Sequence, residues 1–412
     1  MTIDRLHVRL RFAPDLEMSV GTLALAGREV VFQYADDFIS RKLALSPFRL
    51  PLRPGVQVHD RGGGLELFGV FEDALPDGWG RRLLDRHFYK QHGRAPTALE
   101  RLACVGERGM GALTFHPPLD DHVIETDKLD LARLGAEAWQ FDEGSVEDAL
   151  PEIRRTGGTS GGARPKALIG LPCAQNASGP VLPGDGEVPA SHAHWIVKFN
   201  ARADVKEAGP LEFVYAEMAA LAGADMPACR LLKTKAGRFF AVRRFDRPAT
   251  GHRLHMHSAA GLLHANFRVA GEEYDTLFRL VESMTRDYAQ KLELFRRVCL
   301  NVLACNRDDH LKNFAFLMDS HGTWKLAPLF DFTYNNGPNG WHTLSIAGEG
   351  WNPGRSHLME LAQQVDIRSG DAKQMLDETR AAVAQFGKLA RKHGVSAPTI
   401  QRLTARFKEL DA

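Results

Sequence analysis

The stretch Asn306-Arg-Asp-Asp-His-Leu-Lys-Asn313, followed by Leu329-Phe-Asp331-Phe332, decides how this sequence is interpreted. Asp308 and Asn313 are five positions apart, with His310 between them, and Asp331 comes eighteen positions after the asparagine. These polar residues follow an apolar run with helical spacing, and a strand-like run comes directly after Asn313. Two interpretations are open: an ordinary polar helix end followed by a strand and a turn, or a catalytic site.

The spacing favours the second interpretation. Phosphoryl transfer needs a carboxylate that orients the attacking hydroxyl, and oxygen ligands that hold Mg²⁺ across the nucleotide phosphates. In the catalytic loop of protein kinases the Asp and the Asn are also five positions apart, and a later Asp is the second metal ligand. The stretch therefore predicts a magnesium phosphotransferase site, with Asp308 beside the acceptor and Asn313 and Asp331 at the metal.

Composition sets the limits for the whole chain. The 412 residues suggest two to three domains, and 44% hydrophobic with 25% charged residues is ordinary for a globular protein. Lys plus Arg (52) balances Asp plus Glu (51), so the net charge does not indicate a nucleic-acid-binding protein. The five cysteines form no Cys-x-x-Cys pair, and no apolar run is long enough to span a bilayer. We therefore expect reduced thiols, no membrane segment and a cytoplasmic location.

The order of predicted elements indicates three domains. Residues 1–120 have mostly short alternating strands, including a hairpin around Gly27-Arg28, and predict a β-rich accessory domain for partner binding or simple packing. Residues 121–250 mix strands with a helix, and residues 251–412 are mainly helical. The fold class is therefore α+β, a two-lobed protein-kinase-like arrangement preceded by a β-rich subdomain. The histidines at 252, 255, 257 and 264 match no zinc signature, so we expect no metal site there.

A glycine-rich loop occurs at Thr156-Gly-Gly-Thr-Ser-Gly-Gly-Ala-Arg-Pro-Lys166, just before a strand. Glycines let backbone N–H groups approach phosphate oxygens, although a flexible hairpin tip would have the same composition. Lys198 then lies within the apolar strand Trp195-Ile-Val-Lys-Phe199, where burial of an unpaired ammonium would be costly. The kinase lysine that grips phosphates occupies such a position and pairs with a glutamate of the next helix, for which Glu212 and Glu217 are candidates. An outward-facing lysine is the alternative.

These motifs together resemble the HipA family of serine/threonine kinases, the toxins of bacterial toxin–antitoxin pairs, over nearly the whole chain. The resemblance rests on Gly162-Ala-Arg-Pro-Lys166, Ile196-Val-Lys198, Arg244-Phe-Asp-Arg247, the stretch from Asn306 to Asn313, and Ala327-Pro-Leu-Phe-Asp331. In the N-terminal part it rests on Leu45-Ser-Pro47 and Phe71-Glu-Asp-Ala-Leu-Pro-Asp-Gly78. It implies a fold like those of protein and phosphoinositide kinases.

The resemblance implies a role for each matching residue. Asp308 would be the catalytic base, within a catalytic set that includes His310 and Lys312, while Asn313 and Asp331 would hold Mg²⁺. Lys198, paired with Glu212, would contact the phosphates of ATP. The backbone of the hinge near Arg243 and Phe245 would contact the adenine, and Asp246 would lie near the ribose. The loop residues expected at the nucleotide are Gly161, Gly162, Ala163 and Lys166. Autophosphorylation would fall on Thr159 or Ser160.

The family also implies partners. These are a small HipB-like helix-turn-helix antitoxin, DNA reached only through that antitoxin, and a protein substrate, which in some members is an aminoacyl-tRNA synthetase. Two other functions remain as alternatives. A small-molecule phosphotransferase needs the same Asp, Asn and Asp but a closed polar acceptor pocket, and a non-catalytic scaffold for an antitoxin and DNA has no need of them.

Overall fold

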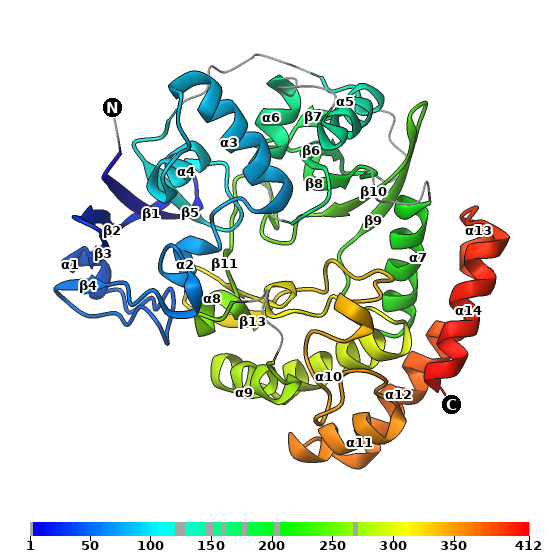
Figure 1. Cartoon of the computed structure of the whole chain (residues 1–412). Helices are drawn as coiled ribbons and strands as arrows, with labels where there is room; N and C mark the ends of the chain where they lie inside the picture. The colour runs from blue at the N-terminus through cyan, green and yellow to red at the C-terminus, as the bar shows by residue number, and fades with distance from the viewer. Residues whose placement is uncertain are drawn as a thin grey trace. The chain divides into compact units, whose positions relative to one another are not determined.

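The computed structural model describes residues 3–119, 128–144, 151–158, 162–174, 179–201, 207–266 and 271–411. The chain separates into two compact units, and Figure 1 labels their helices and strands. Unit 1 comprises Met1–Val205, Leu232–Asn266 and Leu317–Thr323, and unit 2 comprises Lys206–Leu231, Phe267–Phe316 and Trp324–Ala412. Residue 250 lies within the stretch Leu232–Asn266 of unit 1. The predicted domain boundaries near residues 120 and 250 stay predictions.

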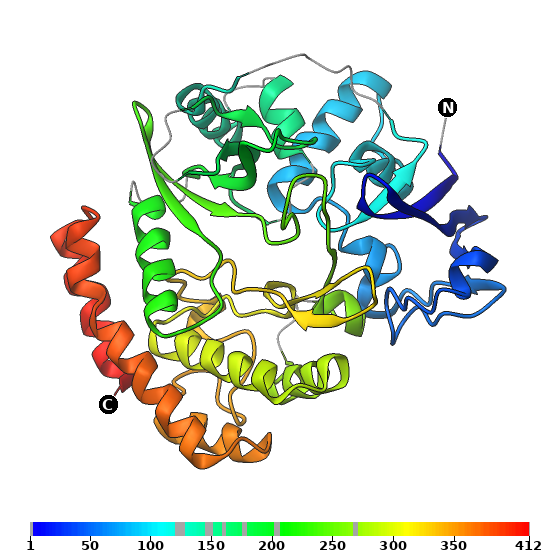
Figure 2. The ribbon, with the colours of Figure 1, turned by 180° about the vertical axis from the view of Figure 1, so that it is seen from behind.

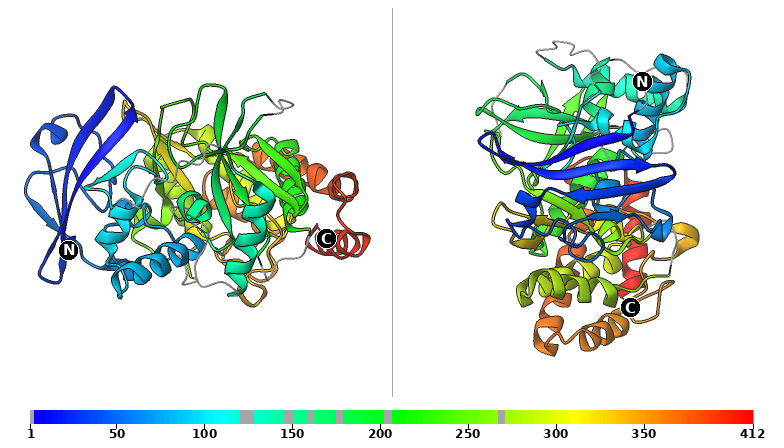
Figure 3. Two further views of the ribbon diagram at one scale, coloured as in Figure 1. Left: turned by 90° about the horizontal axis from the view of Figure 1, so that it is seen from above. Right: turned by 90° about the vertical axis from the view of Figure 1, so that its left-hand side faces the viewer.

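The first sheet of unit 1 is an antiparallel sheet with the strand order β4-β3-β2-β1-β5, whose first strands are blue in Figure 3. Alternation of buried and exposed residues along β1 gives the sheet one apolar face, as the sequence predicts. The predicted hairpin is also confirmed, because Ala26 pairs with Glu29 across the turn at Gly27-Arg28. The strands are β1 (Arg5–Ala13), β2 (Leu16–Ala26), β3 (Glu29–Tyr34), β4 (Val56–Val58) and β5 (Leu113–His116).

Short helices accompany this sheet along the chain. They are α1 (Asp36–Ile39), η1 (Gly62–Gly64), α2 (Gly69–Glu72), α3 (Gly78–His92) and α4 (Ala98–Val105). Helix α4 begins with a capping box, in which the Thr97 hydroxyl accepts the N–H of Glu100 and the Glu100 carboxylate accepts that of Thr97.

The second sheet of unit 1 carries the predicted nucleotide residues. Its strand order is β7-β6-β8-β10-β9. One face packs on α3, α5 and α6 in a core that includes Trp79, Phe141, Ile153, Val197 and Phe239. The elements are α5 (Leu131–Glu143), α6 (Pro151–Gly157), β6 (Lys166–Pro172), β7 (Leu182–Pro183), β8 (His192–Lys198), β9 (Cys229–Thr234) and β10 (Gly237–Arg243).

Strand β11 (His255–Ser258), which precedes α8 (Ala259–Leu263), contains two buried histidines. His255 Nε2 lies 3.1 Å from the carbonyl oxygen of Leu45, so this nitrogen carries the proton and donates it. Burial, with a smaller contribution from the charge of His257, lowers the pKa of His255 to about 3. The neutral imidazole is therefore the form that stabilises the fold.

We expect acid to weaken the fold partly through His255. Its folded pKa of about 3 lies below the unfolded value, so its contribution is complete above about pH 6.5 and is lost as the pH falls towards 3. Between pH 7 and pH 5 the unfolding free energy should fall by about 2 kcal/mol through this group. Urea unfolding of wild type and His255→Gln at both pH values measures it. Equal losses in the two proteins would contradict the assignment.

Unit 2 is mainly helical, and its helices α9 to α14 are coloured from yellow-green to red in Figures 1 and 2. The long helix α10 (Tyr288–Leu303) buries most of its C-terminal half and packs against α9 (Tyr274–Thr285) and α12 (Ser369–Ala384). Helix α7 (Ala208–Leu221) supports the end of α10, because the Tyr215 hydroxyl donates to the carbonyl oxygen of Ala304 at 2.7 Å.

The other helices of unit 2 agree with the mainly helical character predicted for residues 251–412. Helix α12 ends at Ala384, where Gln385 separates it from the next helix, and the last helix begins after Ser396. The remaining elements are η2 (Leu311–Asn313), β12 (Ala315–Met318), β13 (Trp324–Leu326), η3 (Pro338–Gly340), α11 (Arg355–Gln364), α13 (Phe386–Lys392) and α14 (Ala397–Asp411). Among the described residues of the chain, no helix has both the length and the apolar character needed to cross a bilayer. The predicted α+β class, sheet-rich first and helical later, is confirmed.

Candidate active site

The predicted catalytic stretch begins where α10 ends. The helix stops at Ala304, and Cys305 adopts a left-handed conformation (φ 54°) that turns the chain away. Asn306 then pairs with Asn335 in an isolated bridge, and its side-chain amide donates to the Asn301 side chain at 2.9 Å. The stretch is therefore a fixed loop that leads into η2 and β12.

Asp308 is half-exposed in this loop. Its side chain is 46% exposed, and His310 Nε2 lies 3.7 Å from its Oδ1. The Asn313 side-chain amide donates to the Asp308 backbone carbonyl at 2.7 Å, so the Asn313 carbonyl oxygen is the group left for a metal. The structure thus brings Asp308, His310 and Asn313 together.

Asp331 belongs to the same unit and follows β13 after four residues. Two main-chain hydrogen bonds fix the segment before Asp331. The Ala327 N–H donates to the Ala315 carbonyl oxygen at 2.8 Å, and the Leu329 N–H donates to the Asp225 carbonyl oxygen at 2.7 Å. Asp331 itself has φ 56°, a left-handed conformation that few residues other than glycine adopt. Such conformations concentrate at functional sites, where the surrounding structure offsets their strain.

The residues on either side of Asp308 are buried and hold the loop. Arg307 is 2% exposed and donates to the carbonyl oxygens of Gly340 and Trp351, the latter at 3.0 Å. Asp309 is 1% exposed and accepts from the Tyr274 hydroxyl (2.7 Å) and the Thr343 N–H (2.8 Å). The alternation of inward, outward and inward side chains presents Asp308 from a rigid support. Sequence reasoning missed both supporting residues.

Unit 1 carries the residues expected at the phosphates. Lys166 on β6 and Lys198 on β8 stand directly opposite each other in the antiparallel register, and Lys198 Nζ lies 5.9 Å from the centre of the Phe240 ring. Lys166 is also largely buried. The register thus places the two predicted phosphate-binding lysines side by side on neighbouring strands. Their contact with phosphate stays a prediction.

The glycine-rich loop is described from Gly162 onward, and the predicted residues Thr159, Ser160 and Gly161 lie outside the described residues. The Gly162 N–H donates to the Asp77 carboxylate, and the Gly162 carbonyl accepts the Trp79 N–H at 3.0 Å. Gly162 has φ 90°, a backbone conformation that residues with a side chain rarely adopt, which explains why glycine suits this position. The N-terminus of α3 therefore holds the loop close to Lys166.

The hinge residues differ from one another in exposure. Arg243 is exposed and donates to the Pro248 carbonyl at 3.2 Å. Asp246 is fully buried, and its carboxylate accepts from Arg244, Arg247 and the Gly111 N–H. With no exposed surface, this carboxylate ties the end of β10 to the loop before β5. The predicted nucleotide contacts of Arg243, Phe245 and Asp246 stay predictions.

Of the two candidate partners for Lys198, Glu212 is buried on α7. Glu217 bonds instead to Lys392 Nζ (3.0 Å) and His393 Nε2 (2.6 Å) within unit 2. Lys198 belongs to unit 1, so its pairing with Glu212 stays a prediction.

Two other clusters in unit 1 have the composition of sites. Among described residues, His59, Asp60 and His264 could hold a metal ion. His264 Nε2, however, accepts the Gly69 N–H at 3.0 Å, so the ring proton is on Nδ1, the atom that faces the other two residues. That protonated nitrogen cannot be a ligand, and we assign no metal there.

The second cluster has the order of a Ser–His–Asp triad. The Asp73 carboxylate lies 2.6 Å from His257 Nδ1, and His257 Nε2 lies 3.0 Å from the Ser46 hydroxyl. Ser46 is 1% exposed and His257 is fully buried, so no substrate reaches the hydroxyl. Asp73 also accepts from the Ser258 N–H and hydroxyl, and the cluster fastens α2 to β11.

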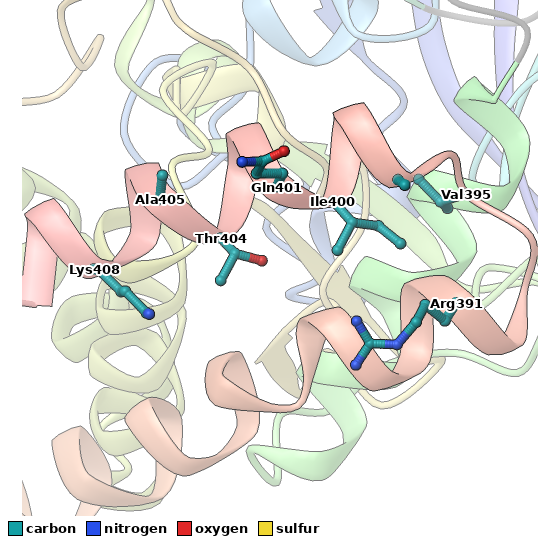
Figure 4. Close-up of a pocket in the computed structure, with 8 residues that line it drawn as sticks. Arg391, Val395, Ile400, Gln401, Thr404, Ala405 and Lys408 are labelled. Carbon is teal, nitrogen blue, oxygen red and sulfur yellow. The ribbon is translucent and has the colours of Figure 1, made fainter.

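An open pocket of about 660 Å³ lies along α13 and α14 in unit 2 (Figure 4). Arg391, Ile400, Gln401 and Lys408 are among its lining residues. None of the predicted site residues lines it, and we assign it no role in phosphoryl transfer.

Comparison with known proteins agrees with this architecture. Residues 158–386 match the model of the HipA-like C-terminal domain, and residues 16–116 match that of the HipA N-terminal domain. The structure superposes on HipA of Shewanella oneidensis, solved in a complex with HipB and operator DNA, with a TM-score of 0.69 and 17% identity over 98% of this chain and 95% of that one. That identity is low, so the likeness shows the fold alone.

Two curated proteins are similar in sequence. The chain is 30% identical over 102 residues to a Haemophilus influenzae protein named "Putative kinase", and 24% identical over 283 residues to "Putative kinase Y4dM" of Sinorhizobium fredii. The matches cover 23% and 63% of this chain, and 30% and 60% of those proteins. The C-terminal domain model alone matches more than half of the chain, and the N-terminal domain model matches the part before it. These matches confirm the resemblance seen in the sequence: the chain belongs to the HipA family.

Proposed function

We propose that the chain is an ATP- and Mg²⁺-dependent protein serine/threonine kinase. One observation carries the proposal: Asp308 is exposed on a loop whose neighbours, Arg307 and Asp309, are buried and fixed, with Asn313 bonded to the same loop. A carboxylate presented in this way suits the orientation and deprotonation of an acceptor hydroxyl. The names of the two curated relatives agree with a kinase.

The residues present fit the required cofactors. The carboxylate of Asp331 and the carbonyl oxygen of Asn313 are hard oxygen donors of the kind that Mg²⁺ prefers. When bound, Mg²⁺ would neutralise charge on the phosphates of ATP. Lys166 and Lys198, with the backbone of Gly162 and Ala163, would contact those phosphates. Asp308 would take the proton from the acceptor hydroxyl as its oxygen attacks the γ-phosphorus, and ADP would leave. His310 and Lys312 would support that step.

We further propose that this kinase is the toxin of a toxin–antitoxin pair in the cytoplasm. The HipA that shares its fold was solved with HipB and operator DNA, which supports a HipB-like antitoxin here and DNA contact through that antitoxin. The protein substrate, for which an aminoacyl-tRNA synthetase is the family precedent, stays a prediction, as does autophosphorylation of Thr159 or Ser160.

The test is to incubate the purified protein with ATP and Mg²⁺ and to map phosphate by intact-mass and peptide mass spectrometry. We expect one phosphate within residues 156–164, and none when EDTA removes the metal. A parallel assay with sugars and aminoglycosides as acceptors tests for a small-molecule phosphotransferase. Phosphate on a small molecule alone would replace the protein-kinase proposal, and no transfer at all would favour a scaffold.

A further inference from the structure

Two glycine–tryptophan pairs, Gly340-Trp341 and Gly350-Trp351, lie ten positions apart in the segment that follows Asp331. Both indole rings are exposed, at 49% of each residue's surface. Their ring centroids are 5.5 Å apart and the ring planes are inclined by 58°. Large apolar groups gathered at the surface in this way are typical of binding sites.

The glycines place the rings. A Cβ on Gly340 would lie 2.9 Å from the Trp351 ring, and a Cβ on Gly350 would lie 3.1 Å from the Trp341 ring. Gly340 also has φ 85°, which disfavours any other residue. Because the His342 N–H donates to the Gly350 carbonyl at 2.8 Å, the two pairs are held face to face. Each ring therefore packs on the glycine of the other pair, and the two rings form one platform.

This platform is joined to the catalytic loop on both sides of Asp308. Arg307 donates to the carbonyl oxygens of Gly340 and Trp351, one from each pair. Asp309 bonds to His342 Nδ1 at 2.8 Å and to the Thr343 N–H at 2.8 Å. The residues before and after the proposed base thus bind the segment that carries the rings, which fixes the platform relative to Asp308.

We propose that Trp341 and Trp351 form the docking platform for the polypeptide that carries the acceptor hydroxyl. They would receive an apolar or aromatic side chain of that polypeptide at a fixed distance from its Ser or Thr. The inference deepens the proposed kinase function and rests on it. Because Arg307 and Asp309 both bond to the segment that carries the rings, a polypeptide bound to the rings would be held at a fixed place relative to Asp308.

The platform offers the flat apolar faces that an apolar or aromatic side chain packs against. Indole faces offer a large contact area at a low entropic cost, because each side chain has only two rotatable bonds. The carboxylate of Glu349 accepts hydrogen bonds from the N–H groups of Trp351 (2.6 Å) and Asn352 (3.1 Å), and so stabilises the turn. These backbone hydrogen bonds lower the pKa of Glu349.

The experiment measures phosphorylation of a positional-scanning library of Ser and Thr peptides with ATP and Mg²⁺. We expect wild type to prefer Leu or Phe over Ala at one fixed position by about tenfold in kcat/KM, the effect typical of a central aromatic contact. In Trp341→Ala/Trp351→Ala this preference should disappear. In Trp341→Phe/Trp351→Phe, which keeps an aromatic ring on each glycine, part of it should return.

Trp139→Ala is the matched control, because Trp139 is also exposed (41%) but lies on α5 in unit 1. It should keep the full preference, and calorimetric ATP affinity verifies that each variant is folded. An unchanged preference in the double Ala variant, or no preference in wild type, overturns the docking platform alone. If wild type phosphorylates neither peptides nor itself, the docking platform fails together with the proposed kinase function.

Discussion

Asp308→Asn is expected to lower the rate of phosphoryl transfer by roughly 10²–10⁴-fold, the usual contribution of a catalytic acid or base. The substitution keeps the size of the side chain but removes the group that would accept the hydroxyl proton. Because the Asp308 side chain is 46% exposed, the variant should fold as well as wild type. Single-turnover transfer from labelled ATP measures the rate, and calorimetry with Mg²⁺ and ATP measures nucleotide binding, which should change little.

Asp377→Asn is the matched control. Asp377 is on α12 in the same unit, is 63% exposed, and lies 3.5 Å from Arg355 in an exposed ion pair that contributes little. Its transfer rate should equal that of wild type. If Asp308→Asn retains a rate within about threefold of wild type, Asp308 is not the base, and the assignment of the loop as a catalytic loop fails with it.

Asp246→Ala is expected to reduce the free energy of unfolding by about 3–5 kcal/mol, the cost of removing one partner from a buried ionic group. Asp246 Oδ2 lies 2.7 Å from both Arg244 Nη2 and Arg247 Nη1. Burial by itself raises the pKa of Asp246, but the two guanidinium charges and the hydrogen bonds outweigh it, so the pKa lies well below its usual range. Without the carboxylate, two buried cations face each other.

Urea unfolding at neutral pH measures this loss, with Asp4→Ala as the control, since Asp4 is an exposed carboxylate of the same unit. The control should change the unfolding free energy by no more than about 0.5 kcal/mol. A loss below about 1 kcal/mol in Asp246→Ala would show that the arginines find other partners, and that the tie between β10 and the loop at Gly111 is weaker than its geometry indicates.

Much of the fold could be predicted from local patterns. The hairpin at Gly27-Arg28, the mainly helical character of residues 251–412 and the strand that contains Lys198 follow from hydrophobic period and turn residues. The spacing of Asp308 and Asn313 also sufficed to locate the loop, because both residues lie on one short stretch of chain.

The supporting contacts could not be predicted, because they join distant parts of the sequence. Asp308 and Asp309 are adjacent and chemically identical, and only the bonds of Asp309 to Tyr274, His342 and Thr343 determine which of them points inward. Asp77 stands at the N-cap position of α3, yet its carboxylate makes no capping bond and instead accepts the Gly162 N–H. No local pattern encodes such pairings.

The division of each unit into three separate stretches of chain has a consequence for biosynthesis. When a ribosome has completed Val205, unit 1 still lacks Leu232–Asn266 and Leu317–Thr323, so about a hundred further residues must be made before its last stretch exists. At roughly 5–20 residues per second this takes on the order of ten seconds. Until β10 has been made, strand β8 lacks its β10 neighbour. A polypeptide that ended before β10 would therefore expose the edge of β8 that β10 later covers.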